Sequence, residues 1–323
     1  MPSPSDDPLS SSSTPAEWER LMLEKVALAS IREQRAARQW KTFVRMAWLA
    51  FFAVLAWVLL QRSTTDARTL TAPHTALVEI RGEIADGTDA SASNILAAAK
   101  AAFEDGGSTA VILLINSGGG SPVQAGIIND ELVRMKTRYK KPLYAVVTDT
   151  CASGAYYIAV AADQIYVDKA SLIGSVGVLM DGFGFTGTMQ KLGVERRLIT
   201  AGENKGFLDP FSPLNPGQKA HAQAMLGQIH QQFIGVVRKG RGARLKETPG
   251  IFSGLVWTGE QAVRMGLADK FGNADSVARD VVKQERIVDY TRRDNVAEKL
   301  AKKFGAAVGA GAMHAMQESM TLR

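Results

Sequence analysis

The sequence predicts an α/β domain with a largely parallel sheet, preceded by one membrane-spanning helix. From Ala76 onward, short aliphatic and β-branched runs alternate with helix-forming segments, which is the pattern of strands joined by helices in an α/β fold. Before that point, Met46–Leu60 is a run of fifteen residues without a polar side chain. The chain of 323 residues can bury one large core beside this segment.

The apolar run predicts a transmembrane helix over residues 43–61. Fifteen residues span about 22 Å, short of a hydrocarbon core of about 30 Å. Phe43 and Val44 lengthen the run, because Arg45 can extend toward the head groups. A buried core helix is the alternative. A cleavable signal peptide is disfavoured, because about 45 residues precede the run.

Charges on either side of the apolar run predict its orientation. Six basic residues and one acidic residue lie between Lys25 and Arg45, whereas Arg62 and Arg68 follow the run. By the positive-inside rule the N-terminus lies in the cytoplasm. We therefore expect a single-pass protein of a bacterial inner membrane, with everything after Leu60 on the periplasmic side.

The chain divides into five predicted segments. These are a Ser/Pro-rich start and exposed cytoplasmic helix (1–42), the transmembrane helix (43–61), a linker (62–75), the α/β domain (76–290), and a basic, then Ala/Gly-rich tail (291–323). Within the domain, strands are expected at 76–84, 109–116, 142–148 and 194–200. Helices are expected at 92–105, 122–139, 154–162, 188–192 and 216–239, with a closing helical region at 260–283.

Composition excludes several functions. The formal net charge is +6, but the basic excess lies before the apolar run and after Val282. Between them charge is nearly balanced, without a basic stripe interleaved with aromatic residues, so no nucleic-acid partner is expected. Cys151 is the single cysteine, which permits no internal disulfide and no multi-cysteine metal site. We expect no metal and no cofactor.

The first candidate site is the glycine loop in "INSGGGSPVQAG", residues 115–126. An apolar strand ends in three glycines, which let backbone N–H groups point into a cavity and hold a phosphate or an oxyanion. No Lys-Ser/Thr follows, and the spacing is not G-x-G-x-x-G, which disfavours a nucleotide. A plain strand-to-helix turn remains the alternative.

The second candidate is Ser153, between a strand and an apolar helix. A serine there can be an N-cap or a nucleophile. The N–H of Gly154, with that of Gly119 or Gly120, could form a two-donor oxyanion hole.

A nucleophilic serine needs a base. The histidines are His74, His221, His230 and His314, and none is expected in a loop adjoining a strand end, so a Ser-His-Asp triad is poorly supported. A lysine can serve where burial keeps its amine neutral. Lys205 is the candidate, since Phe207, Leu208 and Phe211 lie near it in sequence; an ordinary surface lysine is the alternative.

Four stretches, in order, resemble the signal peptide peptidases in their short, single-copy form with one N-terminal span. They are "INSGGG", "CASGAYYIAVAADQIYVDKASLIGSVGVLM", "TAGENKGFLDPFSPL" and "WTGEQAVRMGLADKFG". The resemblance covers Ala76–Arg286. It implies the fold shared by the Clp protease proteolytic subunit and the crotonases, a spiral of ββα units.

The resemblance also implies roles for single residues. Ser153 would be the nucleophile, Lys205 the general base, and Ser175 the residue that holds the lysine amine. Gly154 and Gly120 would donate to the oxyanion. It further implies a homo-oligomeric ring that cuts apolar peptides, such as signal-peptide remnants, at the membrane.

Two positions depart from the family pattern. Gly118 stands where the pattern has Pro, and Leu255 stands where relatives usually carry Arg. Two other functions remain open: a non-catalytic membrane scaffold of the same fold, and a crotonase-type acyl-CoA enzyme, which would need neither Ser153 nor Lys205.

Overall fold

The computed structural model describes residues 40–54 and 72–292. The chain divides into two compact units, Met1–Thr69 and Leu70–Arg323, and each is described by itself. In the first unit, residues 40–54 are helical and exposed. The rest of the predicted transmembrane helix, the N-terminal segment, most of the linker and almost all of the tail lie outside the described residues. Over 40–54 and 72–292, no helix is both long and apolar enough to cross a membrane.

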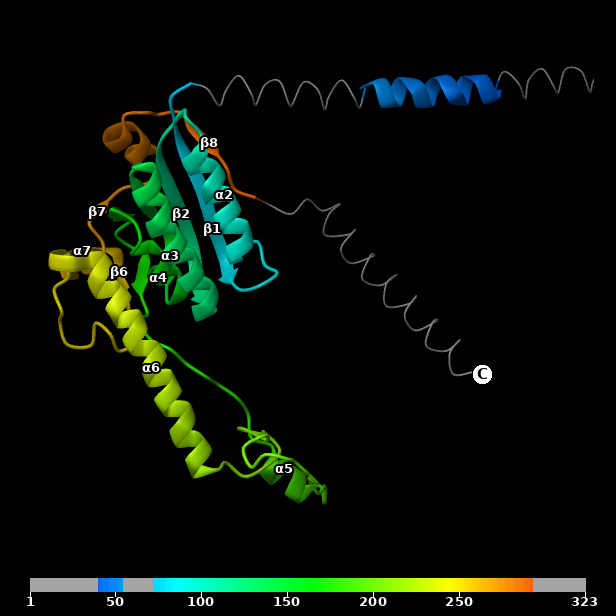
Figure 1. Ribbon diagram of the computed structural model, residues 1–323, viewed down its shortest axis with the longest axis vertical. Coiled ribbons are helices and arrows are strands. Elements are labelled where there is room, and N and C mark those ends of the chain that lie inside the picture. The colour runs from blue at the N-terminus through cyan, green and yellow to red at the C-terminus, as the bar shows by residue number, and fades with distance from the viewer. Residues whose placement is uncertain (1–39, 55–71, 293–323) are drawn as a thin grey trace, which may run out of the picture. The chain divides into compact units, whose positions relative to one another are not determined.

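The second unit contains a mixed sheet in which nearly all strand pairs are parallel (Figure 1). Its strands are β1 (His74–Ile84), β2 (Ser108–Gly120), β3 (Leu143–Ala152), β4 (Gln164–Val167), β5 (Leu172–Gly174), β6 (Val256–Thr258), β7 (Lys270–Phe271) and β8 (Ile287–Asp289). The main order is β6-β5-β3-β2-β1-β8, and β4 pairs with β3 and β7. Only β5 and β6 pair antiparallel among these strands. The predicted α/β class is confirmed.

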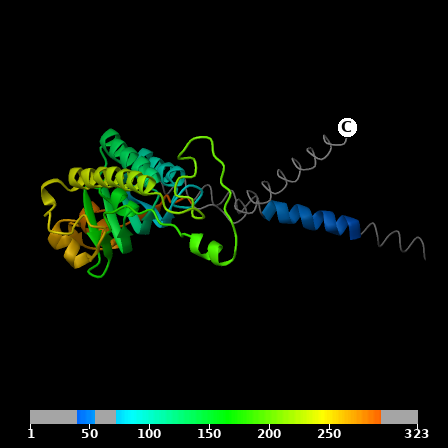
Figure 2. The same ribbon diagram turned by 90° about the horizontal axis from the view of Figure 1, so that it is seen from below.

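Helices cover both faces of the sheet. They are α2 (Ala92–Glu104), α3 (Pro122–Tyr139), α4 (Gly154–Ala159), α5 (Thr186–Lys191), α6 (Pro216–Arg241), η1 (Gly242–Arg244), α7 (Gly259–Met265), α8 (Ala274–Ser276) and the π-helix η2 (Val277–Val282). The larger core lies between the sheet and α2, α3, α4 and the second half of α6. In Figure 2 the sheet lies between α6, in yellow, and the last segments of the domain, in orange.

The bounds of α3 show how local sequence defines an element. Ser121 caps its first turn by accepting a hydrogen bond from Gln124 N, and Pro122 occupies the first turn, where no N–H is needed. The helix ends at Tyr139, because Lys140 after it adopts a left-handed conformation with φ 52°. The predicted range 122–139 is therefore confirmed.

Two predicted elements differ from the structure. Residues 194–200 form no strand. They belong to an arm (residues 178–215) that leaves the sheet after β5 and contains α5 (Figure 1), and a strand needs a hydrogen-bonded neighbour. The closing region 260–283 is divided, because Gly266 (φ +76°) ends α7 and β7 follows.

Candidate active site

Ser153 lies at the turn from β3 into α4, with an unusual backbone conformation. Its φ is 53° and its ψ is −125°, a region that residues other than glycine rarely adopt. Its N–H donates to Gly174 O at 2.8 Å, which ties the turn to β5. The side chain makes no capping hydrogen bond to α4. The N-cap alternative therefore fails, and the hydroxyl is left for other chemistry.

The glycine loop at the end of β2 packs against this turn. A Cβ built on Gly119 would lie 2.7 Å from Gly154 N and 2.8 Å from Ser153 Cβ, and one built on Gly154 would lie 3.3 Å from Gly120 N. Both turns meet because β2 and β3 are parallel neighbours, whose carboxyl ends lie at the same edge of the sheet. The two predicted donor turns are thus adjacent.

Of the two candidate donors on the loop, Gly119 is already engaged. Its N–H donates to Ser117 Oγ at 3.1 Å. The geometry therefore favours Gly120, with Gly154, as the pair that could receive an oxyanion.

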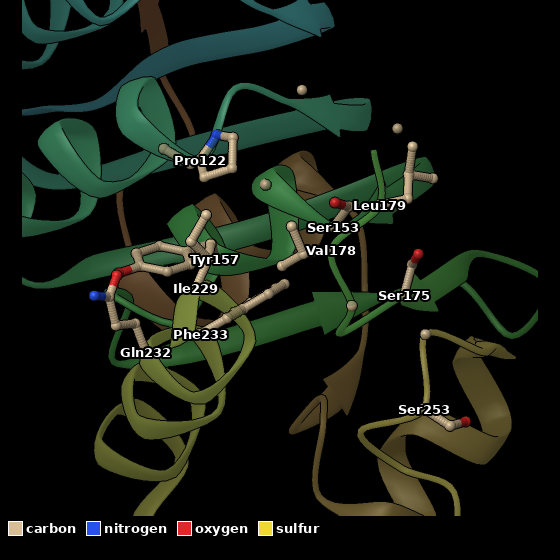
Figure 3. A pocket seen from close by; sticks show the side chains of 16 residues that line it. Pro122, Ser153, Tyr157, Ser175, Val178, Leu179, Ile229, Gln232, Phe233 and Ser253 are labelled. Atoms are coloured by element: carbon tan, nitrogen blue, oxygen red, sulfur yellow. The ribbon is translucent and has the colours of Figure 1, made fainter. Parts of the chain in front are cut away.

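A cavity of about 590 Å³ opens beside these groups (Figure 3). Ser153, Gly154, Gly120 and Ser175 all line it, and its size suits a few peptide side chains. Gly118 also lines it, and a Cβ built there would meet nothing within 4 Å. Glycine at this position, where the family pattern has Pro, thus leaves this side of the cavity open and creates no void in the packed core.

The cavity has an aromatic wall that the sequence did not assign. Tyr157 of α4 and Phe233 of α6 line it, with ring centroids 5.1 Å apart. Burial, and then the charge of Asp130, raise the pKa of Tyr157, so its hydroxyl stays neutral. The adjacent Tyr-Tyr pair in the sequence of α4 could have indicated an aromatic wall. The contact with α6 could not have been predicted, because it joins residues far apart in the chain and has no local sequence pattern.

Ser175 continues the wall from the end of β5. It has a φ of 50°, and its N–H donates to Leu255 O at 2.8 Å. On the next residue, Val176 O accepts a hydrogen bond from His230 Nε2 at 3.0 Å, which fixes this segment to α6. Leu255 stands where relatives usually carry Arg, and its side chain is exposed. At this position only the backbone carbonyl, which accepts the hydrogen bond from Ser175 N, contributes to the site.

Lys205 does not line the cavity. Its side chain is exposed, although Phe207 and Leu208 beside it are half-buried. The turn that carries it packs on the first turns of α6, where Leu208 N donates to Gln218 Oε1 at 3.0 Å. Ile229, at the cavity, lies eleven residues further along α6, which is about 16 Å of helix. In this conformation of the chain, Lys205 therefore lies outside the cavity.

Cys151 has no part in this site. It is fully buried, and burial raises the pKa of its thiol, so the reactive thiolate does not form near neutral pH. Over residues 40–54 and 72–292, no cluster of His, Cys, Asp or Glu could hold a metal ion.

Comparison with known proteins shows similarity to a peptidase family. Residues 135–288, which include Ser153, α4, β5, the arm and α6, match the model described as peptidase family S49. Just under half of the chain is thus similar to peptidase family S49. This confirms the resemblance to the signal peptide peptidases.

Individual relatives align with this chain over only part of their lengths. A putative protease of Methanocaldococcus jannaschii is 32% identical over 54% of this chain and 58% of its own length. A putative signal peptide peptidase of Enterococcus faecium is 28% identical over 50% of this chain and 48% of its own. A Brucella abortus protein named as a sodium/proton antiporter is 41% identical over 50% of this chain but only 22% of its own length. The chain thus spans less than two thirds of these relatives.

Proposed function

We propose that this chain is a membrane-anchored serine endopeptidase that cleaves apolar peptides, with Ser153 as nucleophile and Lys205 as general base. The observation that carries the proposal is the uncapped Ser153 hydroxyl on a strained turn, beside Gly154 and Gly120 in one cavity. The similarity of residues 135–288 to a peptidase family supports it.

The reaction follows from these positions. Ser153 Oγ attacks the peptide carbonyl carbon while the neutral amine of Lys205 takes the hydroxyl proton. The carbonyl oxygen becomes an oxyanion, which accepts hydrogen bonds from the N–H groups of Gly154 and Gly120. The lysine then protonates the leaving amine. Water attacks the resulting ester of Ser153 and gives a proton to the same lysine. The bond from the carbonyl carbon to Ser153 Oγ then breaks, the lysine returns the proton to Oγ, and the carboxylic acid product leaves and ionises.

The exposed position of Lys205 requires an assembly step. We propose that a ring of copies supplies Lys205 from the arm of a neighbouring copy to each cavity, where Ser175 holds the amine. The arm carries strongly exposed apolar side chains: Leu179 (80% exposed), Phe183 (81%), Leu192 (73%) and Ile199 (95%). Exposed apolar surface of this kind is typical of a protein–protein contact. Closing of the arm within one chain is the other route, and the experiment below separates them.

The substrates and location are part of the same proposal. The cavity walls are mainly small, aliphatic and aromatic residues, with no Asp, Glu, Lys or Arg among its lining residues, which suits apolar peptides such as signal-peptide remnants. Residues 43–61 would anchor the chain in a bacterial inner membrane with the peptidase domain on the periplasmic side.

The test is labelling and hydrolysis by the full-length chain in detergent. A fluorophosphonate should label the wild type at Ser153, and Ser153→Ala should lose both labelling and cleavage of an apolar peptide. Ser253→Ala is the matched control, because Ser253 lines the same cavity but donates its hydroxyl to Gly250 O. Absence of labelling in the wild type would support a non-catalytic scaffold instead.

The base is tested by a second pair of variants. Lys205→Ala should abolish hydrolysis, whereas Lys191→Ala, which removes another lysine of the arm, should not. Mixing inactive Ser153→Ala with inactive Lys205→Ala copies should restore activity if the base comes from a neighbour. No restoration, despite mixed assemblies, would show that the arm closes within one chain.

A further inference from the structure

Strand β2 is out of regular register with both neighbours at Ser117. On the β1 side the register shifts between Arg81 and Glu83, so that Gly82 opposes two residues of β2. On the β3 side it shifts between Ile115 and Ser117. Such irregularities interrupt the hydrogen-bond ladder and leave backbone groups to find other partners. They occur here immediately before the glycine loop.

At this interruption the Ser117 hydroxyl bonds to β1 and to the end of its own strand, β2. Ser117 Oγ donates to Gly82 O of β1 at 2.5 Å and accepts from Gly119 N at 3.1 Å. Ser117 is 2% exposed and Gly119 is buried, so the Gly119 N–H could not turn to water instead, whereas Gly82 is exposed. Without the hydroxyl, the buried N–H of Gly119 would lose its partner, and Gly82 O would lose its bond from Ser117.

These bonds fix the loop where it meets the nucleophile turn. Gly119 and Gly120 have φ values of +101° and +149°. Glycine has no side chain that would hold its backbone in one conformation, so other restraints must do so. The hydrogen bond from Gly119 N to Ser117 is such a restraint. It sets the orientation of the next peptide unit, which carries the N–H of Gly120.

We propose that Ser117 is the positioning residue of the oxyanion site, which it serves by holding the Gly120 N–H in line with that of Gly154. The inference rests on the proposed peptidase function. Ser117 is not among the residues that line the cavity, so it acts through the loop and not on the substrate. Since a donor that is already aimed costs no reorganisation in the transition state, loss of the hydroxyl lowers kcat and leaves substrate binding nearly unchanged.

A matched control separates this role from a structural one. Ser171 is also 2% exposed. Its Oγ donates to Thr148 O at 2.5 Å and accepts from Asp168 N at 3.0 Å. Ser171→Ala thus also removes a buried serine hydroxyl that bridges a backbone C=O and a backbone N–H, with a similar loss of stability, at a place that does not touch the glycine loop.

The experiment compares Ser117→Ala and Ser171→Ala in the full-length chain. We expect similar Tm losses, a fall in kcat of about tenfold or more with KM nearly unchanged for Ser117→Ala, and nearly wild-type kcat for Ser171→Ala. A peptide aldehyde, which forms a tetrahedral adduct with Ser153, should bind Ser117→Ala more weakly by a similar factor. A cleaved product peptide should bind both variants equally.

Equal kcat in the two variants, with an active wild type, would overturn the positioning role. If Ser117→Ala does not fold, Ser117→Gly takes its place, and failure of both to fold would overturn the role as well, because the hydroxyl would then be purely structural. An inactive wild type would instead refute the proposed function.

Discussion

Asp269 is the centre of a buried ionic network, and its replacement by Asn should strongly destabilise the domain. Its carboxylate accepts hydrogen bonds from Arg241 Nη1 and Nη2, both at 2.8 Å, from Arg244 Nη1 at 3.3 Å and from Ile165 N at 2.7 Å. The Arg241 side chain is 0% exposed and that of Asp269 is 11% exposed. The network joins the end of α6 to β4.

The cost follows from what Asn would present to Arg241. Both carboxylate oxygens face guanidinium donors, so either orientation of the amide places an NH₂ group against one of them. Arg241 would then be a buried charge without its counter-charge. Removal of one partner of a buried pair costs about 3–5 kcal/mol. For a domain of this size, that corresponds to a fall in Tm of about 6–20 °C.

The effect should also depend on pH. Burial by itself would raise the pKa of Asp269, but hydrogen bonds from Arg241 and Ile165 N and the two guanidinium charges lower it below 3.8. A group whose folded pKa is lowered stabilises the fold above its ordinary pKa and loses that effect as the pH falls through the folded pKa. The difference in Tm between wild type and Asp269→Asn should therefore be largest at neutral pH and become smaller below pH 3.8.

Thermal unfolding of the full-length chain, followed by circular dichroism, measures this difference. Asp280→Asn is the matched control, because the Arg279–Asp280 pair has side chains 54% and 58% exposed, and exposed pairs contribute about 0–1 kcal/mol. Indistinguishable Tm values for the two variants, or a difference that does not change with pH, would refute the reasoning.

Three further predictions concern single sites. Gly120→Ala should lower kcat by about 10²–10³, because its Cβ would lie 2.2 Å from Ile84 O and displace the loop; steady-state kinetics would contradict this if kcat were unchanged. Cys151 should react with iodoacetamide only after unfolding, since it is buried and burial raises its pKa, so mass spectrometry that finds rapid alkylation of the native chain would disprove it. Tyr290→Phe should weaken the loss of stability on acidification below pH 3.8, where the lowered pKa of Asp105 takes effect. Burial alone would raise the pKa of Asp105, and the Tyr290 hydroxyl at 2.6 Å is the main interaction that lowers it; identical acid titrations of stability in variant and wild type would argue against this.

The parts of the site that could be predicted are those that local sequence controls. A glycine loop and a Ser-Gly turn each follow an apolar strand, and neighbouring parallel strands bring such turns together. The choice between Gly119 and Gly120 could not be made, since it depends on a side chain, Ser117, at a change of register that only the neighbouring strands define.

The environment of Lys205 was harder to predict for a similar reason. Phe207 and Leu208 lie close to Lys205 in sequence, which suggests that they bury its amine. In the structure they pack toward α6, while the lysine faces outward. Which way a turn faces depends on the position of a long helix in space. That position is set by contacts such as those of Phe233 with Tyr157, many residues away.

The positive φ of Ser153 also limits which amino acids this position can hold. A β-branched side chain is strongly disfavoured at φ 53°, so threonine would strain the turn although it carries the same reactive group. Cysteine and glycine have no branch at Cβ and would fit. Backbone shape thus restricts replacement of the hydroxyl here, independently of how well another alcohol could react.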